Sequence, residues 1–467
     1  MKKEIEKLKN SDRYRLKYHL MPVEGLLNDP NGLIEKDGVY NIFYQVNDKE
    51  CCHGPKKWGH YKSKDLINWE IKEFALSPEE NFESHGCYSG SAILHKGKIH
   101  LFYTGNVKTE KGERESYQCL AVENDKGTFD KLGPIISEIP KGYTEHFRDP
   151  KVFERDGLYY MVLGAQNNNL KGEVLLYISK DLKNWELLKS IYTKEDLGYM
   201  IECPDLFELD GERILLSSPQ GIEPQGSLYN NLYQSGYMLS LDEEFGHWWT
   251  EFKELDRGFD FYAPQTFIDS KGRRIMYAWM GMEEENHPTI HEGNWVHALT
   301  IPRELKIKNH KIVQLPLAEL KALRKNSIEK NNVLIKDSII FPGILGESFE
   351  MIVDFENISA KSFGIKLRKS DNEEILIVFE KNKLNLDREK TPFLKGKRQC
   401  NISGKNHKLQ IFMDTSSLEF FYNDGEEVFT SRIYVSSESK EIEFFSQDGE
   451  VLIKKLEFFQ MDSFNYY

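Results

Sequence analysis

Three acidic residues stand in similar local sequence, each next to a proline or two residues before one. Asp29 lies in "NDPN", Asp149 in "FRDPK" and Glu202 in "IECPD". Proline fixes φ and removes an amide donor, which suits the start of a strand where the chain turns inward. A single Asp beside Pro is ordinary turn chemistry. Three such acids at matching places in a repeat are not needed for bending, so they predict a chemical role.

Carboxylates that converge without a metal ion can divide into an ionised group and a protonated group, because each charge raises the pKa of its neighbour. Glycoside hydrolysis uses such a pair: one carboxylate attacks or stabilises the sugar, and the other protonates the leaving oxygen. Aromatic, amide and hydroxyl side chains form the lining that a sugar needs. The candidates of this kind are Trp58, Tyr88, Tyr262 and Trp279, with Asn28, Gln45 and Ser89. For any one Trp or Tyr, packing in the core is the alternative.

A repeated phrase indicates how the chain positions these residues. An apolar strand, a polar turn ending in Gly and a second strand rich in β-branched and aromatic residues occur five times. The turn glycines recur about every 60 residues, at Gly38, Gly97, Gly157, Gly211 and Gly272. Hairpin-rich units of this length are typical of four-stranded propeller blades, so we expect a five-bladed β-propeller. Unrelated hairpins in a sandwich are the alternative.

Each acid lies a few residues before its turn glycine, where the first strand of its unit begins. Residues seven to nine positions before the five glycines are Asp29, Ser89, Asp149, Glu202 and Gln265. Rotation about the channel of a propeller brings equivalent positions of different blades together. The repeat therefore predicts that these side chains meet at the mouth of the channel.

The repeats end near "LTIPREL", and a different pattern follows. Pro316–Asn326 is predicted to be a short helix or linker, with Leu317, Leu320 and Leu323 on one face. Beyond it, alternating strands with Asp-Gly turns predict a β-sandwich of about 140 residues. We therefore expect an all-β chain with a catalytic propeller at 1–325 and a sandwich at 326–467.

Composition restricts the partners. The net charge of −13 argues against a sequence-independent hold on nucleic acid or an anionic membrane. The amino terminus lacks the apolar stretch of a secretory signal, and no run of about 18 apolar residues occurs, so a cytoplasmic protein is expected. Six cysteines without paired spacing predict reduced thiols. A zinc site formed by Cys51, Cys52, His53 and His60 is the alternative, but adjacent cysteines rarely share one tetrahedral site.

The sequence resembles glycoside hydrolase family 32, the group of invertases, fructanases and sucrose-6-phosphate hydrolases, over nearly its whole length. The matching motifs appear in the order of the family: "NDPNG", "FYQ", "WGHYKSKDLINW", "YSGSA", "FRDP", "ECPD" and "DFYAPQTF". "SPQG", "YQSGY" and "LTIPREL" look most like the bacterial intracellular sucrose-6-phosphate hydrolases. The motifs "LNLDR" and "YNDGEEVFTSRIY" resemble the β-sandwich that follows the propeller in this family.

The resemblance implies a role for each acid. Asp29 would be the nucleophile on the anomeric carbon of a β-fructofuranosyl unit, and Glu202 the general acid and then the general base. Asp149 would hold sugar hydroxyls and stabilise the transition state, with Arg148 beside it. Configuration would be retained, so Asp29 and Glu202 should lie about 5–5.5 Å apart. No cofactor would be needed, and the partner would be a small sugar; the sequence predicts no oligomeric state.

One loop departs from the family and leaves the substrate open. After "FYQ" the family often has an aromatic residue and then Asn-Pro, whereas this chain has "VND" and then "KECCHGPKK". Lys56 and Lys57 in this loop are either a phosphate contact or, the reading we prefer, a solvated surface pair. The leading hypothesis is hydrolysis of sucrose 6-phosphate or sucrose. Hydrolysis of inulin or levan oligosaccharides, an arabinan-type substrate and a sugar-binding propeller without catalysis are the alternatives.

Overall fold

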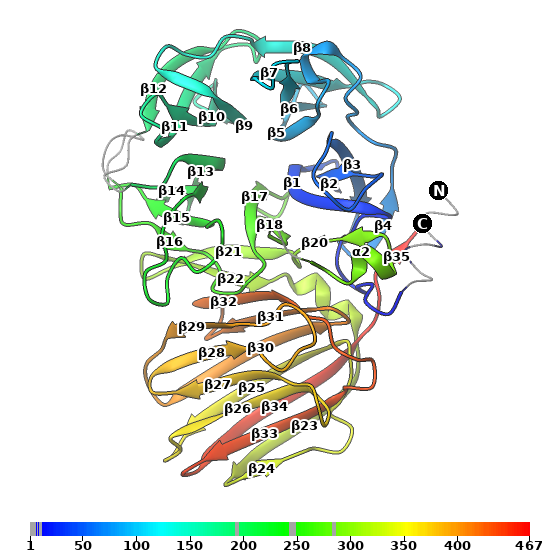
Figure 1. The fold of residues 1–467 in the computed structure, drawn as a ribbon, viewed down its shortest axis with the longest axis vertical. Coiled ribbons are helices and arrows are strands. Elements are labelled where there is room, and N and C mark those ends of the chain that lie inside the picture. Colours follow the sequence, from blue (N-terminus) through cyan, green and yellow to red (C-terminus); the bar gives the residue numbers. More distant parts are fainter. Residues whose placement is uncertain (1–5, 7, 9–11, 192–195, 242–248, 283–285) are drawn as a thin grey trace.

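The computed structural model describes residue 6, residue 8 and residues 12–191, 196–241, 249–282 and 286–467. The chain is an all-β protein, in which a five-bladed β-propeller is followed by a β-sandwich, as the sequence predicts (Figure 1). The helical elements with described bounds are short: η1 (Asn81–Glu83), α2 (Thr289–Glu292) and η2 (Ala318–Leu323). No helix in the described residues is long and apolar enough to cross a membrane.

In each of the first three blades, the strands that follow one another in the chain pair antiparallel. Blade 1 contains β1 (Gly25–Lys36), β2 (Val39–Asn47), β3 (Lys57–Ser63) and β4 (Asn68–Ile71). Blade 2 contains β5 (Cys87–His95), β6 (Lys98–Lys108), β7 (Arg114–Glu123) and β8 (Phe129–Ile136). Blade 3 contains β9 (Tyr143–Arg155), β10 (Leu158–Asn167), β11 (Gly172–Ser179) and β12 (Glu186–Ile191).

The last two blades follow the same order. Blade 4 contains β13 (Met200–Leu209), β14 (Glu212–Gln220), β15 (Gly236–Leu239) and β16 (Lys253–Glu254). Blade 5 contains β17 (Tyr262–Ile268), β18 (Arg274–Met280), β20 (Ala298–Leu299), β21 (Arg303–Lys308) and β22 (Lys311–Pro316). Blade 1 also receives β19 (Trp295–Val296) beside β1, and β35 (Asn465–Tyr466) from the end of the chain beside β4.

The turn glycines join the first and second strand of every blade. All five have φ between +74° and +85°, a conformation in which glycine carries no steric penalty. The first strands then contact one another in a closed cycle: β1 with β5, β5 with β9, β9 with β13, β13 with β17, and β17 with β1. They therefore surround the propeller axis.

Every first strand contains a β-bulge near its beginning. Two residues of the first strand oppose one residue of the second strand in all five blades: 28–29, 88–89, 149–150, 203–204 and 263–264. A bulge bends the strand and changes the direction of its side chains. The bulges include or adjoin all three acids.

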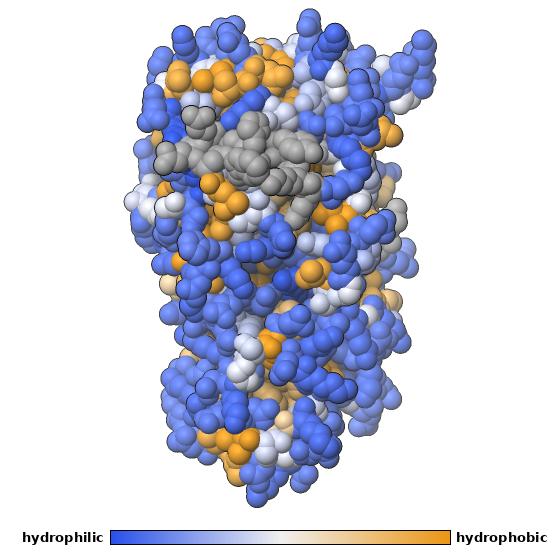
Figure 2. Space-filling view, turned by 90° about the vertical axis from the view of Figure 1, so that its left-hand side faces the viewer, coloured by the Kyte–Doolittle hydropathy of each residue, from blue (hydrophilic) through white to orange (hydrophobic). Residues whose placement is uncertain are grey.

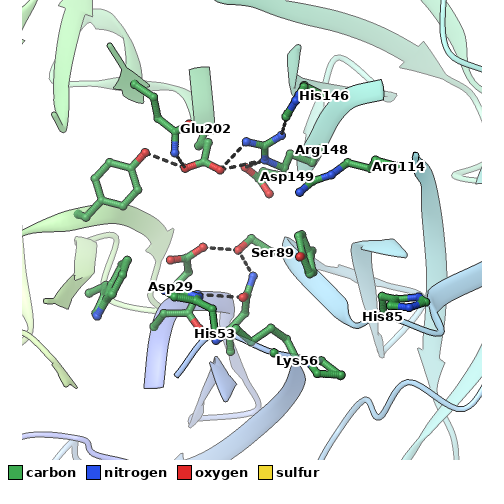
Figure 3. Close-up of a pocket in the computed structure, with 18 of the residues that line it drawn as sticks. Asp29, His53, Lys56, His85, Ser89, Arg114, His146, Arg148, Asp149 and Glu202 are labelled. Carbon is green, nitrogen blue, oxygen red and sulfur yellow. Dashed lines mark hydrogen bonds and ion pairs between the residues drawn. The ribbon is translucent and has the colours of Figure 1, made fainter. Parts of the chain in front are cut away.

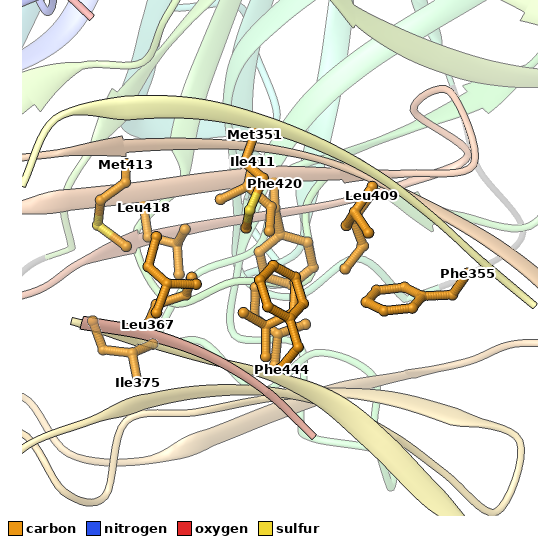
Figure 4. Packing of buried hydrophobic residues seen from close by; sticks show 14 of the residues in the cluster. Met351, Phe355, Leu367, Ile375, Leu409, Ile411, Met413, Leu418, Phe420 and Phe444 are labelled. Carbon is orange, nitrogen blue, oxygen red and sulfur yellow. The ribbon is translucent and has the colours of Figure 1, made fainter. Parts of the chain in front are cut away.

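The sandwich follows the propeller. One six-stranded sheet contains β23 (Arg324–Ile335), β34 (Val451–Met461), β25 (Phe349–Asn357), β30 (Asn406–Asp414), β31 (Ser417–Tyr422) and β32 (Glu427–Arg432). The other contains β24 (Ser338–Ile339), β33 (Glu441–Gln447), β26 (Ser362–Lys369), β27 (Ile375–Glu380), β28 (Lys383–Asp387) and β29 (Lys397–Asn401). Apolar side chains from both sheets interdigitate between them, among them Met351, Phe355, Leu367, Leu409 and Phe444 (Figure 4).

The connection between the domains differs in part from its prediction. The 3₁₀ helix η2 covers Ala318–Leu323 within the predicted helix or linker, and the first sandwich strand already begins at Arg324. Leu317, Leu320 and Leu323 are buried together. Their spacing of three residues fits a 3₁₀ helix, which has three residues per turn. The division at residue 325 stays a prediction.

Buried ionic groups join the propeller to the sandwich. Arg303 in β21 is fully buried; its guanidinium binds Glu419 and donates to Asp256 Oδ2 at 3.2 Å. His19 lies between Asp414, at 2.9 Å, and Glu419, at 3.0 Å. Apolar residues of both domains pack around them. The face shown in Figure 2 is mainly hydrophilic, with separate apolar areas.

Candidate active site

A cavity of about 450 Å³ lies where the first strands of the five blades meet, and each of these strands contributes to its lining. Ten of the eleven residues predicted for the site line it: Asn28, Asp29, Gln45, Tyr88, Ser89, Arg148, Asp149, Glu202, Tyr262 and Trp279. Figure 3 shows Asp29 and Glu202 facing each other across this pocket.

Asp29 is held by a chain of hydrogen bonds from uncharged side chains. Ser89 Oγ donates to Asp29 Oδ2 at 2.5 Å, and Gln45 Nε2 donates to the same hydroxyl oxygen. Asn28 Nδ2 in turn donates to Gln45 Oε1 at 2.8 Å. Burial raises the pKa of Asp29 to about 6; the charge of Glu202 adds to this, and the Ser89 hydrogen bond opposes it. Asp29 is therefore a fixed carboxylate that is ionised above about pH 6.

Glu202 is surrounded by donors. Arg148 donates to Glu202 Oε1 from Nε at 2.9 Å and from Nη2 at 2.7 Å. The Tyr262 hydroxyl and Gln220 Nε2 donate to Glu202 Oε2 at 2.7 and 2.8 Å. Burial acts to raise the pKa of Glu202, but the charge of Arg148 and these hydrogen bonds outweigh it and lower the pKa. Glu202 is thus ionised in the unliganded site.

Asp149 completes the group from the bulge of β9, where its φ is +67°. Its backbone N–H donates to Thr104 Oγ1 at 3.0 Å, and the Cys203 N–H donates to Asp149 Oδ2 at 3.0 Å. Burial and the nearby charge of Glu202 raise the pKa of Asp149 to about 7. A non-glycine residue with positive φ is uncommon and often marks a functional position.

The three carboxyl groups therefore differ in their affinity for a proton, as converging acids should. In the free site a proton is bound more tightly by Asp29 and Asp149, whose pKa values are raised, than by Glu202, whose pKa is lowered; the charge of Arg148 lowers the pKa of both Asp149 and Glu202, but its hydrogen bonds go to Glu202. Interacting acids titrate as one cluster. The arrangement offers a nucleophilic carboxylate and a proton-transfer group on opposite sides of one pocket.

Two positions differ from their expected places. Trp58 lies outside the pocket lining: it is fully buried in the core and donates from Nε1 to the Tyr88 carbonyl at 3.1 Å. Trp58 is therefore not in place to make the predicted contact with a sugar; it packs in the core next to the backbone of Tyr88. Gln265, the fifth member of the repeat, is buried and accepts from Lys151 Nζ at 3.4 Å outside the pocket lining. The bulge in β17 brings Tyr262 to the pocket instead.

Further lining residues were not predicted for the sugar site: His53, Gly54, Pro55, His85, Lys108, Arg114, His146, Tyr199 and Gln220. Gln220 carried a signal because it belongs to the motif "SPQG", and His53, Gly54 and Pro55 carried one because they belong to the unusual loop "KECCHGPKK". The solvated reading of Lys56 was wrong, since this residue is 3% exposed and lines the pocket. Lys57 is half-buried, with its Nζ 2.8 Å from Asp48 Oδ2.

The cysteine-rich loop gives no support to the zinc alternative. Cys51 Sγ is 3.8 Å from Asn294 Oδ1, whereas His60 is buried against Phe43. Within the described part of the chain, no group of three or more His, Cys, Asp or Glu side chains is arranged to hold a metal ion. All six cysteines are free thiols.

Comparisons with known proteins identify relatives over the whole length. The pattern of the Glycosyl hydrolases family 32 N-terminal domain matches residues 19–316, and that of the family 32 C-terminal domain matches residues 319–460. A sucrose-6-phosphate hydrolase of Bacillus subtilis is 43% identical over 460 residues, which cover 94% of this chain and 93% of the relative. A sucrose-6-phosphate hydrolase of Staphylococcus xylosus is 39% identical, with 96% and 94% covered.

Solved structures agree with these matches. A sucrose-6-phosphate hydrolase from Lactobacillus gasseri superposes with a TM-score of 0.90 at 31% identity, covering 99% of this chain and 97% of that chain. A mutant of a Bombyx mori GH32 β-fructofuranosidase in complex with sucrose superposes with a TM-score of 0.85 at 33% identity, covering 99% and 96%.

Proposed function

Because the chain belongs to glycosyl hydrolase family 32, we propose that it hydrolyses sucrose 6-phosphate, and sucrose itself, with retention of configuration. The chain is a glycoside hydrolase of the β-fructofuranosidase type. Its products are fructose and glucose 6-phosphate, or glucose when sucrose is the substrate. The observation that carries the proposal is the convergence of Asp29, Asp149 and Glu202 from three blades on one pocket.

In the first step Asp29 attacks the anomeric carbon of the fructosyl unit. A bond forms between its carboxylate oxygen and that carbon, while the bond to the glycosidic oxygen breaks. Glu202 donates its proton to this oxygen, and the glucosyl product leaves. In the second step the Glu202 carboxylate takes a proton from water, which displaces Asp29 and releases fructose. The side chains and water complete the reaction, so no cofactor enters it.

For this sequence Glu202 must hold a proton when the sugar is bound, although Arg148 favours its ionised form in the free site. We expect sugar hydroxyls to donate hydrogen bonds to Asp29 and Asp149. Such bonds favour the ionised aspartates. The proton of the cluster then moves to Glu202, where the Tyr262 hydroxyl, 2.7 Å from Oε2, holds the carboxyl group in place.

We expect Asp149 to bind sugar hydroxyls and to stabilise the positive charge that develops on the fructosyl ring. Its rigid attachment through Thr104 and the Cys203 amide supports this role. Arg148 acts on Glu202 and sets its orientation. Asn28 and Gln45 position Asp29 through Ser89 and leave further polar atoms for the sugar.

We also propose that the enzyme works in the cytoplasm. A phosphorylated disaccharide that forms on import is available only inside the cell. Six free thiols are suited to a reducing compartment. An assay of the purified protein under reducing conditions therefore represents its working conditions.

The test is the release of fructose from sucrose 6-phosphate and from sucrose by the wild type, Glu202→Gln and Glu208→Gln. Glu208 lies on the same strand, is exposed and pairs with Arg213, so its variant is a matched control. We expect Glu202→Gln to lower kcat at least about 100-fold, the usual contribution of general acid–base catalysis, and Glu208→Gln to match the wild type. Retained turnover in Glu202→Gln would contradict the assigned role.

Inulin assayed in parallel separates the fructan alternative. If the wild type cleaves inulin with a higher kcat/KM than either form of sucrose, a fructan oligosaccharide is the substrate. If it cleaves none of the three, the proposed function fails.

A further inference from the structure

The pocket has one wall that is rich in cations. Lys56, Lys108 and Arg114 line it together with His85; in Figure 3 Arg114 and His85 lie toward the right of the pocket and Lys56 at its lower edge near His53. The net charge of the whole chain is −13, so this wall has the opposite sign of charge to the protein as a whole. The wall near Tyr262 and Trp279 carries neutral aromatic side chains instead.

The backbone holds these cations together. Lys108 and Arg114 are directly opposite each other in the ladder between β6 and β7. The Lys108 N–H donates to His85 Nδ1 at 3.1 Å, and the Cys87 N–H donates to the Lys56 carbonyl at 2.9 Å. The wall is therefore a built feature of blade 2 and of the loop before β3.

This placement brings two like charges together, on an exposed Lys108 and a half-buried Arg114. Like charges directly opposite each other in a sheet are destabilising. Among the described residues, neither Lys108 nor Arg114 has a carboxylate within ion-pair distance; the guanidinium of Arg114 instead lies 5.8 Å from the centre of the Tyr88 ring. Burial and the charge of Arg148 lower the pKa of Arg114, although Tyr88, Glu202 and Asp149 act in the opposite direction.

We propose that Arg114 and Lys108, with His85 and Lys56 beside them, form the subsite that binds the phosphate of a phosphorylated sugar. The inference rests on the proposed function and specifies its substrate class. A sugar phosphate carries nearly two negative charges at neutral pH. With the fructosyl unit over Asp29, the glucosyl unit lies toward the rim, and its 6-phosphate meets the cationic wall. A planar guanidinium can bind two phosphate oxygens at once, and a lysine supplies a point charge.

The experiment compares Arg114→Gln, Lys108→Gln and the double variant by the ratio of kcat/KM for sucrose 6-phosphate to kcat/KM for sucrose. This ratio cancels changes that affect both sugars. Lys111→Gln is the matched control, because Lys111 is an exposed lysine in the same β6–β7 hairpin outside the pocket lining. We expect the ratio to fall about 10- to 100-fold in the double variant, the range for loss of hydrogen bonds to a charged group, and to stay unchanged in Lys111→Gln. Arg114→Lys should lose less than Arg114→Gln, because it keeps the charge.

A ratio that is unchanged in the double variant would overturn the subsite while leaving the hydrolase function intact. Calorimetric titration with glucose 6-phosphate and with glucose tests the subsite without turnover. We expect glucose 6-phosphate to bind the wild type more tightly than glucose does, and the double variant to lose this difference. If the wild type binds glucose 6-phosphate and glucose equally, the proposed phosphate subsite is wrong even if sucrose is cleaved. If neither form of sucrose is cleaved but the phosphate preference is present, the proposed function fails and the subsite stands.

Discussion

Replacing the proposed nucleophile by its neutral isostere should make the protein more stable while it removes activity. Asp29 is held in a place that disfavours its charge: burial and the neighbouring Glu202 raise its pKa more than the hydrogen bonds of Ser89 and Asn28 and the charge of Lys56 lower it. Asp29→Asn keeps the shape of the side chain and an oxygen that can accept the hydrogen bond from Ser89. It removes the charge that attacks the sugar.

The magnitude follows from the pKa. Raising the pKa of Asp29 from its ordinary 3.8 to about 6 corresponds to about 3 kcal/mol of destabilisation of the ionised native state above pH 7. Asp29 keeps partial contact with solvent, so this is a ceiling, and we expect Asp29→Asn to gain about 1–3 kcal/mol at pH 7.5. As the pH falls through 6, native Asp29 takes up a proton before the unfolded chain does. The stability of the wild type then rises toward that of the variant, and at pH 4.5 about one third of the difference remains.

Thermal unfolding of the wild type and Asp29→Asn at pH 7.5 and pH 4.5 measures this difference. The variant should have the higher Tm at pH 7.5, by a few degrees, and the gap should narrow at pH 4.5. Asp37→Asn, at an exposed turn of the same blade, is the control and should leave Tm unchanged at both pH values. A variant that melts at or below the wild type at pH 7.5, or a gap that does not depend on pH, would refute the reasoning.

Two further predictions follow from the same structure. As the pH is lowered, kcat/KM should fall with an apparent pKa between about 6 and 7, because Asp29 and Asp149 titrate as a cluster and the nucleophile must be ionised. A pH profile from 5 to 9 measures this, and no decline below pH 6 would contradict it. Arg303→Met should lower the free energy of unfolding by about 3–5 kcal/mol, because the buried carboxylates of Glu419 and Asp256 lose the guanidinium that lies between them. Urea unfolding measures the loss, and a change under about 1 kcal/mol would show that the ion pairs contribute little.

The repeat, the turns and the three acids could be predicted because their signals are local. A Gly at the end of a polar turn between two β-rich segments specifies a hairpin wherever it occurs, and five evenly spaced copies specify a propeller. Asp29, Asp149 and Glu202 could be selected because each lies near a proline at a matching distance from such a turn. The family resemblance then supplied roles that spacing alone could not.

The remaining features depend on how strands meet. A bulge is a register shift between two strands, and nothing in the sequence of β17 alone shows that its bulge brings Tyr262 to the pocket and keeps Gln265 out of it. Trp58 follows the general rule that a large aromatic side chain is buried, and only the packing of blade 1 on blade 2 decides that it lies in the core rather than in the pocket lining. The prediction that Lys56 is solvated was wrong for a related reason: lysine side chains are rarely buried, and only the packing of the folded chain shows that this one is.

The central claim is that Asp29 forms a covalent bond to the fructosyl unit, and the stereochemistry of transfer tests it most directly. Sucrose 6-phosphate is hydrolysed in water containing methanol, and the methyl fructoside is identified by nuclear magnetic resonance. Two displacements at the anomeric carbon, by Asp29 and then by methanol, predict methyl β-fructofuranoside. Formation of the α-anomer would show a single displacement and would contradict Asp29 as the nucleophile.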